Sequence, residues 1–183
     1  MSDEVLKNKI VLITGASNGI GRATARLLAR KGATIAIGYH ANRDRAVAVL
    51  KSLTDARHSI IQVDISNPKS VKKMAEKIKN SYGKLDVLIN SAGLTMPIPH
   101  KDLETLDEKV FDKLLQLNAG GPFSVIRHHI DLLKKANQSV VINVSSISAF
   151  TGSGSNIAYC AAKGALDTMT KSFARVFLSL IHI

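Results

Sequence analysis

The sequence predicts an α/β fold, a doubly wound parallel sheet with helices on both faces. Short apolar, β-branched runs alternate along the 183 residues with longer segments of helical spacing. The short runs are apolar at nearly every position, which is typical of strands buried on both faces. Their alternation with helices implies right-handed crossovers between parallel strands. We see no internal repeat, charged block or low-complexity linker, so we expect a single domain over residues 1–183.

Each of the first three strands is followed by a helix. The three apolar runs predict strands at 10–14, 34–37 and 59–63. The segments of helical spacing after them predict helices at 20–31, 43–53 and 69–82. In the first helix arginines recur every four residues, and in the third helix lysines do the same, which is typical of the solvated face of an amphipathic helix.

The last two strands, predicted at 87–90 and 140–144, lead into the two loosest stretches of the chain. The stretch 94–102 contains two prolines, and 148–156 is rich in Gly and Ser. Helices are expected after them, over 106–135 and 156–180. Both loops lie at carboxyl ends of strands, where open α/β sheets bind their ligands, so we expect a ligand site there.

Composition excludes several classes of protein. No apolar run approaches the roughly 18 residues that a membrane helix needs, and the chain begins without a signal-peptide core. The single cysteine, Cys160, excludes a disulfide framework and a cysteine zinc cluster, and His128 and His129 are adjacent, so they cannot form an i,i+4 metal pair. We therefore expect a cytoplasmic protein with no membrane partner and no metal.

The chain is strongly basic, with 25 Lys and Arg against 14 Asp and Glu, a net charge of +11. Aromatic residues make up only 4% and do not interleave with the basic ones, so a base-stacking platform is absent. A basic surface with a general attraction for phosphate-bearing ligands is the simpler interpretation, and we expect no nucleic-acid partner.

The strongest local motif lies between the first strand and the first helix, in the run Thr14-Gly15-Ala16-Ser17-Asn18-Gly19-Ile20-Gly21. Glycines there let the backbone turn tightly and approach a pyrophosphate, and a helix beginning near Asn18 points its free N–H groups at that anion. The motif alone also fits a tight turn that binds nothing.

The second strand ends without the acidic residue that usually bonds the ribose hydroxyls in dinucleotide folds, since no acid occurs before Asp44. Arg43 is in position to pair with a 2′-phosphate, which favours NADP over NAD. The alternative is that Arg43 is simply the exposed first residue of a helix.

Tyr159 and Lys163 stand four residues apart, on one face of the last helix. A neighbouring ammonium favours the phenolate form of a tyrosine and brings proton transfer into a useful range at neutral pH. Ser146, at the end of the fifth strand, is in reach of a substrate carbonyl held near that phenol. On spacing alone, a Tyr and a Lys one turn apart are usually structural.

Together, five motifs resemble the short-chain dehydrogenase/reductase family, and most closely its 3-oxoacyl-acyl-carrier-protein reductase-like members. The motifs are Thr14–Gly21, Asn90-Ser91-Ala92-Gly93, Asn118, Ser146 and Tyr159-Cys160-Ala161-Ala162-Lys163. The likeness runs from about residue 9 to about 176. It implies a Rossmann-like dinucleotide-binding fold and an oxidoreductase that transfers a hydride between NADP, less favourably NAD, and a small-molecule ketone or secondary alcohol.

The resemblance also implies residue roles. Tyr159 is expected to be the general acid or base, Lys163 to support it, Ser146 to polarise the carbonyl, and Asn118 to hold a water at an irregularity of its helix. The residues expected to contact the cofactor are Gly15, Ser17, Asn18, Gly19, Ile20, Gly21, Arg43, Asp64, Ile65, Asn90, Ala92, Gly93, Tyr159 and Lys163. The family assembles through helices that correspond to 106–135 and 156–180, so a homodimer or homotetramer is expected.

After Val176 the sequence departs from the family pattern, and we expect a C-terminally incomplete domain that lacks the last strands of the family fold. The fifth strand is then expected to be an apolar edge. Two alternatives follow: a truncated, catalytically silent dinucleotide-binding or interaction module of the same family, and, far less favoured, an anion or nucleic-acid binder.

Overall fold

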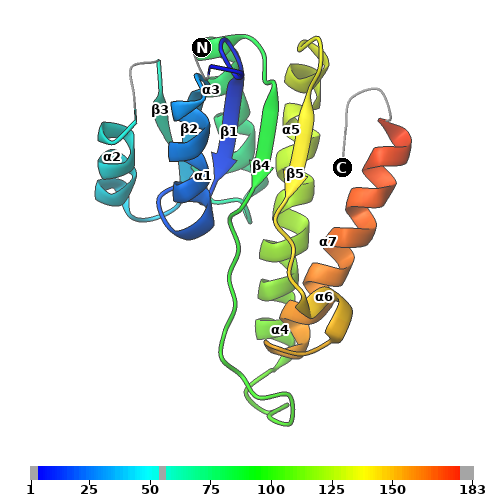
Figure 1. Ribbon diagram of the computed structural model, residues 1–183. Helices are drawn as coiled ribbons and strands as arrows, with labels where there is room; N and C mark the ends of the chain where they lie inside the picture. The colour runs from blue at the N-terminus through cyan, green and yellow to red at the C-terminus, as the bar shows by residue number, and fades with distance from the viewer. Residues whose placement is uncertain (1–3, 54–56, 178–183) are drawn as a thin grey trace.

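Five parallel strands form one sheet in the order β3-β2-β1-β4-β5 (Figure 1). The computed structural model describes residues 4–53 and 57–177. The strands are β1 (Ile10–Thr14), β2 (Thr34–Tyr39), β3 (Ser59–Gln62), β4 (Val87–Asn90) and β5 (Val140–Asn143). The chain runs outward from β1 to β3 and then returns to the other side of β1 for β4 and β5. This is the doubly wound parallel sheet that the sequence predicts.

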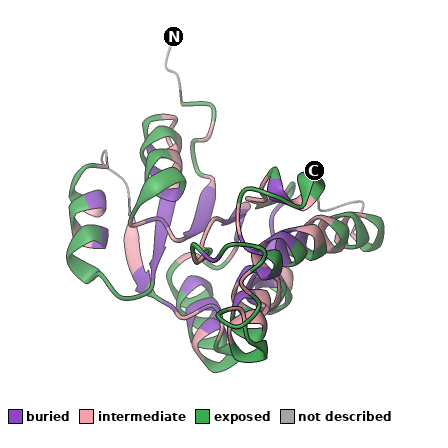
Figure 2. Cartoon of the chain, turned by 90° about the horizontal axis from the view of Figure 1, so that it is seen from below, coloured by how far each residue is buried: buried purple, intermediate pink, exposed green. Residues whose placement is uncertain are grey.

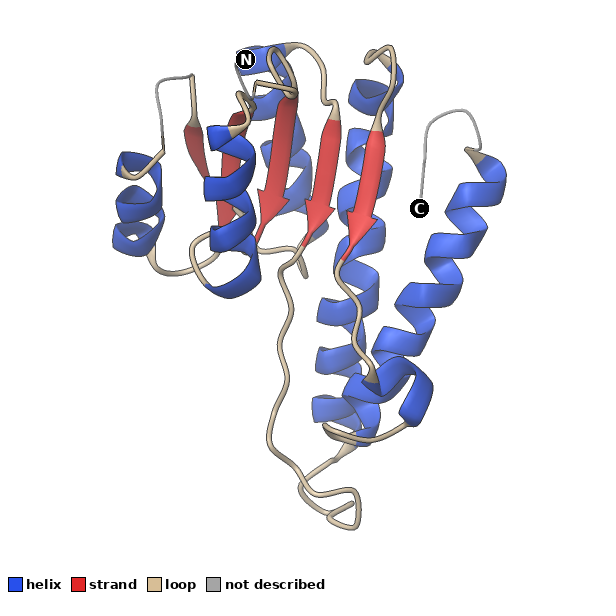
Figure 3. Ribbon diagram, in the orientation of Figure 1, coloured by secondary structure: helices blue, strands red, loops and turns tan. Residues whose placement is uncertain are grey.

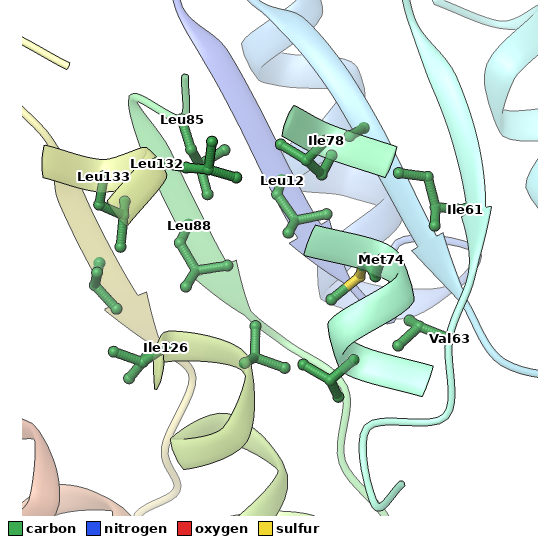
Figure 4. Packing of buried hydrophobic residues seen from close by; sticks show 14 of the residues in the cluster. Leu12, Ile61, Val63, Met74, Ile78, Leu85, Leu88, Ile126, Leu132 and Leu133 are labelled. Carbon is green, nitrogen blue, oxygen red and sulfur yellow. The ribbon is translucent and has the colours of Figure 1, made fainter. Parts of the chain in front are cut away.

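Helices cover both faces of the sheet (Figure 3). On one face lie α1 (Gly19–Arg30) and α2 (Arg43–Lys51); on the other lie α3 (Pro68–Tyr82) and α5 (Gly121–Lys134). Successive residues of β1 enter different cores, since Val11 and Ile13 pack with the first pair of helices and Leu12 with the second. Figure 2 shows the buried strands between more exposed helices, and Figure 4 shows the core under α3 and α5. Burial on both faces is why the central strands are mainly apolar, whereas the edge strand β3 begins with Ser59 and ends with the exposed Gln62.

The helix expected over 106–135 is divided in three. It begins as α4 (Glu108–Leu115), widens into a π-helical turn, η1 (Gln116–Gly120), and continues as α5. The side chain of Asn118 explains the widening, because its Nδ2 donates to the carbonyl oxygen of Leu114 at 2.9 Å and competes with the regular helical hydrogen bond. The irregularity expected at Asn118 is therefore present, while a continuous helix was wrong.

The last helices lie beyond the fifth strand. A short helix, α6 (Ser148–Thr151), interrupts the Gly/Ser-rich loop, and α7 (Ile157–Val176) follows it. Positions 178–180 of the predicted helix lie outside the described residues. Within the described part of the chain, β5 pairs only with β4 and Ile142 is 45% exposed, as expected of an apolar edge. No helix among the described residues is long and apolar enough to cross a membrane.

His129 lies in the core on α5 without full hydrogen bonding. Its Nδ1 donates to the carbonyl oxygen of Val125 at 2.8 Å, and its Nε2 has no partner among the described residues. Burial, with a smaller contribution from the neighbouring His128, lowers the pKa of His129 from 6.5 to about 4. The folded protein therefore keeps this imidazole neutral well below the pH at which an unfolded chain protonates it.

We expect the free energy of unfolding to fall as the pH drops from 6.5 to about 4, because in this window the unfolded chain binds a proton that the folded chain does not. The loss contributed by His129 is about 3 kcal/mol over the window, and below it the contribution is constant. Denaturant unfolding at a series of pH values measures it. The variant His129→Leu should have a flatter profile than the parent, and His128→Gln should flatten it much less, because His128 is the smaller cause of the shift; parallel profiles for the parent and His129→Leu would contradict the account.

Candidate functional site

The carboxyl ends of β1, β4 and β5 lie next to one another, at the point where the strand order reverses. Thr14, Asn90 and Asn143 are the last residues of these strands and stand in register across the sheet. The three segments that follow carry the glycine turn, the Ser91-Ala92-Gly93 loop and Ser146. Parallel pairing thus brings together motifs that lie far apart in the sequence, at the edge where α/β sheets bind ligands.

The glycine turn packs backbone against backbone. A Cβ added to Gly15, whose φ is +69°, would lie 2.8 Å from the Cα of Ala92, and one added to Gly21 would lie 2.6 Å from the carbonyl oxygen of Gly15. The Thr14 hydroxyl accepts the N–H groups of Ser91 and Ala92, both at 3.2 Å, which joins the two loops. Only glycine fits these approaches, so the motif is constrained by packing as well as by any ligand.

The turn leads directly into the N-terminus of α1. Asn18 is the N-cap, and its side chain makes no capping hydrogen bond. Gly19 and Ile20 are exposed at this end. The first-turn N–H groups of α1 consequently have no capping side chain and are available to an anion above the turn.

A cavity of about 310 Å³ lies beside the turn, between the ends of β2 and β3 and helix α4. Five of the predicted residues line it: Gly15, Asp64, Ile65, Ala92 and Gly93. Hydrogen bonds from Ser66 lower the pKa of Asp64, so its carboxylate is ionised at neutral pH. The cavity therefore offers an anionic hydrogen-bond acceptor among mostly apolar walls, which suits a heterocyclic base and its sugar.

Leu94, which also lines this cavity, belongs to the loose stretch 94–102 where a ligand site was expected, whereas sequence reasoning missed the remaining lining residues Tyr39, His40, Val63, Lys113 and Leu117. Tyr39 is the last residue of β2 and His40 follows it, and their place at the carboxyl end of this strand was a usable signal. Lys113 comes from α4, and nothing in the local sequence indicates that α4 reaches this cavity.

A second, basic cavity of about 300 Å³ lies on the other side of the turn, between α1 and α2. Ser17, Asn18, Arg22, Arg26 and Arg45 line it together with two apolar residues of α2. The Nε of Arg26 donates to the hydroxyl of Ser52 at 3.0 Å, which orients this guanidinium without neutralising it, so three positive charges line the cavity. Arg43 is exposed at the start of α2 and does not line either cavity.

Asn118 is fully buried, and its amide is held by backbone. Oδ1 accepts the N–H of Leu94 at 3.2 Å, and Nδ2 donates to the carbonyl oxygens of Leu94 at 2.8 Å and of Leu114. A Cβ added to Gly93 would lie 2.9 Å from this Oδ1 and 3.8 Å from the Nζ of Lys163. The loop after β4, the π-turn and α7 therefore meet at Gly93.

Lys163 is a buried cation beside Tyr159. The residue is 5% exposed, and its Nζ donates to the carbonyl oxygen of Val144 at 2.8 Å and lies 5.7 Å from the centroid of the Tyr159 ring. Burial lowers the pKa of Lys163, and Asp167 opposes this shift. The phenol of Tyr159 is only partly buried, so this side chain borders both the ammonium and the solvent.

Ser146 lies on the loop between β5 and α6. Its Oγ accepts the N–H of Ser148 at 3.2 Å, and no hydrogen bond between described residues joins it to Tyr159. The Oγ of the neighbouring Ser145 is buried, with no partner in the described part of the chain. Asn90 lines neither cavity, because its amide turns toward Asn143. Among the described residues no group of His, Cys, Asp and Glu is arranged to hold a metal ion.

Comparison with known proteins gives consistent matches. A family model described as short chain dehydrogenase matches residues 9–179. The chain is 35% identical over 168 residues to a 3beta-hydroxysteroid dehydrogenase of Mediterraneibacter gnavus, covering 91% of this chain and 59% of that protein. It is 32% identical over 176 residues to a 3-oxoacyl-(acyl-carrier-protein) reductase of Staphylococcus epidermidis, covering 94% of this chain and 70% of that protein.

Solved structures of short chain dehydrogenases also superpose closely on this fold. A crystal structure of a protein from Escherichia coli CFT073, complexed with NADPH, superposes with a TM-score of 0.91 at 25% identity, covering 100% of this chain and 77% of that one. The chain spans 59%, 65% and 60% of the length of three curated relatives, a hydroxysteroid dehydrogenase, an oxidoreductase of Thermotoga maritima and a secoisolariciresinol dehydrogenase. It is therefore shorter than the proteins that it resembles.

Proposed function

The chain belongs to the short-chain dehydrogenase family, and from this premise we propose that it is an NADP-dependent oxidoreductase that interconverts a ketone and a secondary alcohol. The observation that carries the proposal is the buried ammonium of Lys163, held by Val144 and 5.7 Å from the ring of Tyr159. A buried cation next to a partly exposed phenol is an arrangement suited to proton transfer. The names of two curated relatives support the same chemistry, since one is a hydroxysteroid dehydrogenase, which acts on a hydroxyl group, and the other is an oxoacyl reductase, which acts on a ketone.

The residues present fit a nicotinamide dinucleotide. Gly15 and Gly21 hold the turn in a tight backbone packing, while a Cβ added to Gly19 would meet no atom within 4 Å, so the space above the uncapped first turn of α1 is open to a pyrophosphate. The cavity that contains Asp64 would hold the adenosine half, and Tyr159 and Lys163, which come together beside Gly93, would bind the nicotinamide ribose. When bound, such a cofactor supplies the hydride, and the protein supplies geometry and proton transfer.

In the proposed reduction, Tyr159 donates its phenolic proton to the carbonyl oxygen of the ketone, and in the reverse direction it accepts the proton of the alcohol. Lys163 stabilises the phenolate that remains. Ser146 orients the carbonyl oxygen by a hydrogen bond. Asn118, whose side-chain amide is hydrogen-bonded to both the N–H and the carbonyl oxygen of Leu94, holds a water that returns the proton to Tyr159. Each step uses a residue of this chain as donor, acceptor or fixed dipole.

Assembly is part of the proposal. Phe123 of α5 stacks on Phe173 of α7 with ring centroids 6.0 Å apart, and Phe123 is itself exposed. Together with the family's use of the corresponding helices, this aromatic pair makes α5 and α7 the proposed interface of a dimer or tetramer.

The 2′-phosphate that distinguishes NADP from NAD is assigned to the arginines around the start of α2. Arg43 is the candidate from the sequence, and Arg45 lines a basic cavity with Ser17 and Arg22. We expect Arg45→Ala to weaken NADPH binding at least tenfold, because a charge-assisted hydrogen bond of about 1.5–3 kcal/mol is lost, and to leave NADH binding unchanged. Fluorescence titration of each cofactor against Arg45→Ala, Arg43→Ala and the control Arg30→Ala measures this; equal losses for NADPH and NADH would contradict the assignment.

The proposed function is tested by mixing the chain with NADPH and a panel of aliphatic and cyclic ketones, and by following the NADPH absorbance. The proposal predicts oxidation of NADPH that depends on both ketone and protein. Tight NADPH binding with no oxidation for any ketone would favour the alternative, a catalytically silent module of the same family.

A further inference from the structure

Helix α7 carries both Tyr159 and Lys163, and its connection to the sheet is narrow. It packs mainly against α4, η1 and α6 rather than against the strands. Figure 1 places it beyond β5, at the end of the sheet opposite β3. Two side-chain hydrogen bonds join α7 to the end of β5: Lys163 Nζ donates to the carbonyl oxygen of Val144, and Asn143 Nδ2 donates to Thr170 Oγ1, each at 2.8 Å.

The second of these bonds belongs to a row of polar side chains that runs from β4 through β5 to α7. Asn90 Nδ2 donates to Asn143 Oδ1 at 2.8 Å, Asn143 Nδ2 donates to Thr170 Oγ1, and Thr170 Oγ1 donates to the carbonyl oxygen of Leu166 at 2.7 Å. The direction of the row is fixed because the carbonyl oxygen of Leu166 can only accept, so Thr170 donates to it and must itself accept from Asn143. It links the last residues of β4 and β5 to the middle of α7.

Polar groups in this position are costly, since Asn90 is buried and its Oδ1 has no partner among the described residues. Apolar side chains would fill the same space at less cost in desolvation. Hydrogen bonds constrain the position of a helix more strictly than apolar packing does, because they need a donor–acceptor distance of about 3 Å. A slip of one turn along α7 moves every side chain by about 5.4 Å and would break them.

The polar row and the proposed active site use the same face of α7. Lys163, Leu166 and Thr170 are spaced i, i+3 and i+7, so they point the same way, and the acceptors of the two links, Val144 and Asn143, are consecutive residues. We infer that Asn143 and Thr170 are positioning residues, which hold α7 so that the amine of Lys163 stays against Val144 and beside Tyr159. This inference rests on the proposed function for its catalytic consequence, but not for the placement of the amine.

The placement can be measured without turnover. Thr170→Val removes the hydroxyl at nearly constant volume, Thr170→Ala removes it with a smaller side chain, and Thr170→Ser restores it. Thr168→Val is the matched control, because Thr168 is exposed on the same helix. The readout is the rate at which an amine-acylating reagent labels Lys163, divided by the rate for exposed Lys51 on α2, both followed by peptide mass spectrometry.

We expect this ratio to rise about tenfold in Thr170→Val and Thr170→Ala, the size of effect that follows from losing the part-buried hydrogen bond of Asn143, which joins β5 to α7. It should return to within about twofold of the parent in Thr170→Ser and Thr168→Val. A ratio unchanged in both Thr170→Val and Thr170→Ala, with only a lower melting temperature, would overturn the inference and leave Thr170 a purely structural residue.

The kinetic consequence separates this inference from the proposed function. If the parent reduces ketones, Thr170→Val should lower kcat with little change in KM, and Thr170→Ser should recover it. If the parent binds NADPH without turnover, the proposed function fails, and the labelling ratio still decides whether Thr170 positions Lys163.

Discussion

Replacing Tyr159 by Phe is expected to lower NADPH-dependent ketone reduction about a thousandfold, the usual contribution of a positioned general acid being about 10²–10⁴. The ring and its contact with Lys163 remain in the variant, while the transferable proton is lost. Binding of NADPH should stay within about threefold of the parent, because the glycine turn and the cavity around Asp64 are untouched. Steady-state rates and a fluorescence titration of NADPH on the same preparations measure the two quantities.

Tyr82→Phe is the matched control for this experiment. The Tyr82 hydroxyl donates to the carbonyl oxygen of Arg57 at 2.9 Å and bonds the hydroxyl of Ser59 at 2.7 Å, next to the opposite edge strand β3. Its loss should lower stability slightly and leave turnover unchanged. A Tyr159→Phe protein that retained a tenth or more of the parental rate would contradict the role of the phenol, since the loss would fall below the range expected for general acid catalysis.

Replacing Gly21 by Ala is expected to weaken NADPH binding at least about a hundredfold and to lower the free energy of unfolding by about 1–3 kcal/mol. The added Cβ would lie 2.6 Å from the carbonyl oxygen of Gly15 and 3.0 Å from the Cα of Ala16. Both atoms belong to the backbone of the glycine turn, so the turn itself must move. A movement of this turn would displace the backbone N–H groups proposed to bind the pyrophosphate. Titration of NADPH measures the loss of binding, and thermal or denaturant unfolding measures the loss of stability.

Gly164→Ala provides the same chemical change with the opposite expected sign. Gly164 lies inside α7, and an added Cβ would meet nothing nearer than the carbonyl oxygen of Ala149 at 3.8 Å. Alanine at such a helical position stabilises by about 0.5–1 kcal/mol, and NADPH binding should not change. If Gly21→Ala bound NADPH as tightly as Gly164→Ala does, the glycine turn would not be the cofactor site.

The strands and the glycine turn were readable from the sequence because their signals are local. Strands buried on both faces are apolar at nearly every position, and β1 is a clear case, with four apolar residues before Thr14 and all five residues buried. The turn around Gly15 was recognisable because three glycines follow the first strand within seven residues. The division of the long helix at Asn118 was less readable, since it depends on a hydrogen bond to Leu114 and on bonds to Leu94, 24 residues away.

Contacts between distant segments account for what the sequence could not supply. Asn143 meets Thr170 only because β5 pairs in a particular register with β4 and because α7 lies beyond it. Lys113 reaches a cavity between β2 and β3 through the packing of α4, and Arg45 faces Ser17 through the packing of α2 on α1. None of these pairings leaves a periodicity or a motif in the chain.

Transfer of a label tests the central claim most directly. The chain is incubated with a ketone that it reduces and with NADPH deuterated at the transferable position of the nicotinamide, and the alcohol is examined by mass spectrometry. Direct hydride delivery beside Tyr159 predicts a product that carries the deuterium on its carbinol carbon and has exchanged none of it with water. An alcohol without deuterium, or bound NADPH that yields no alcohol from any ketone tried, would contradict the assignment of this fold to carbonyl reduction.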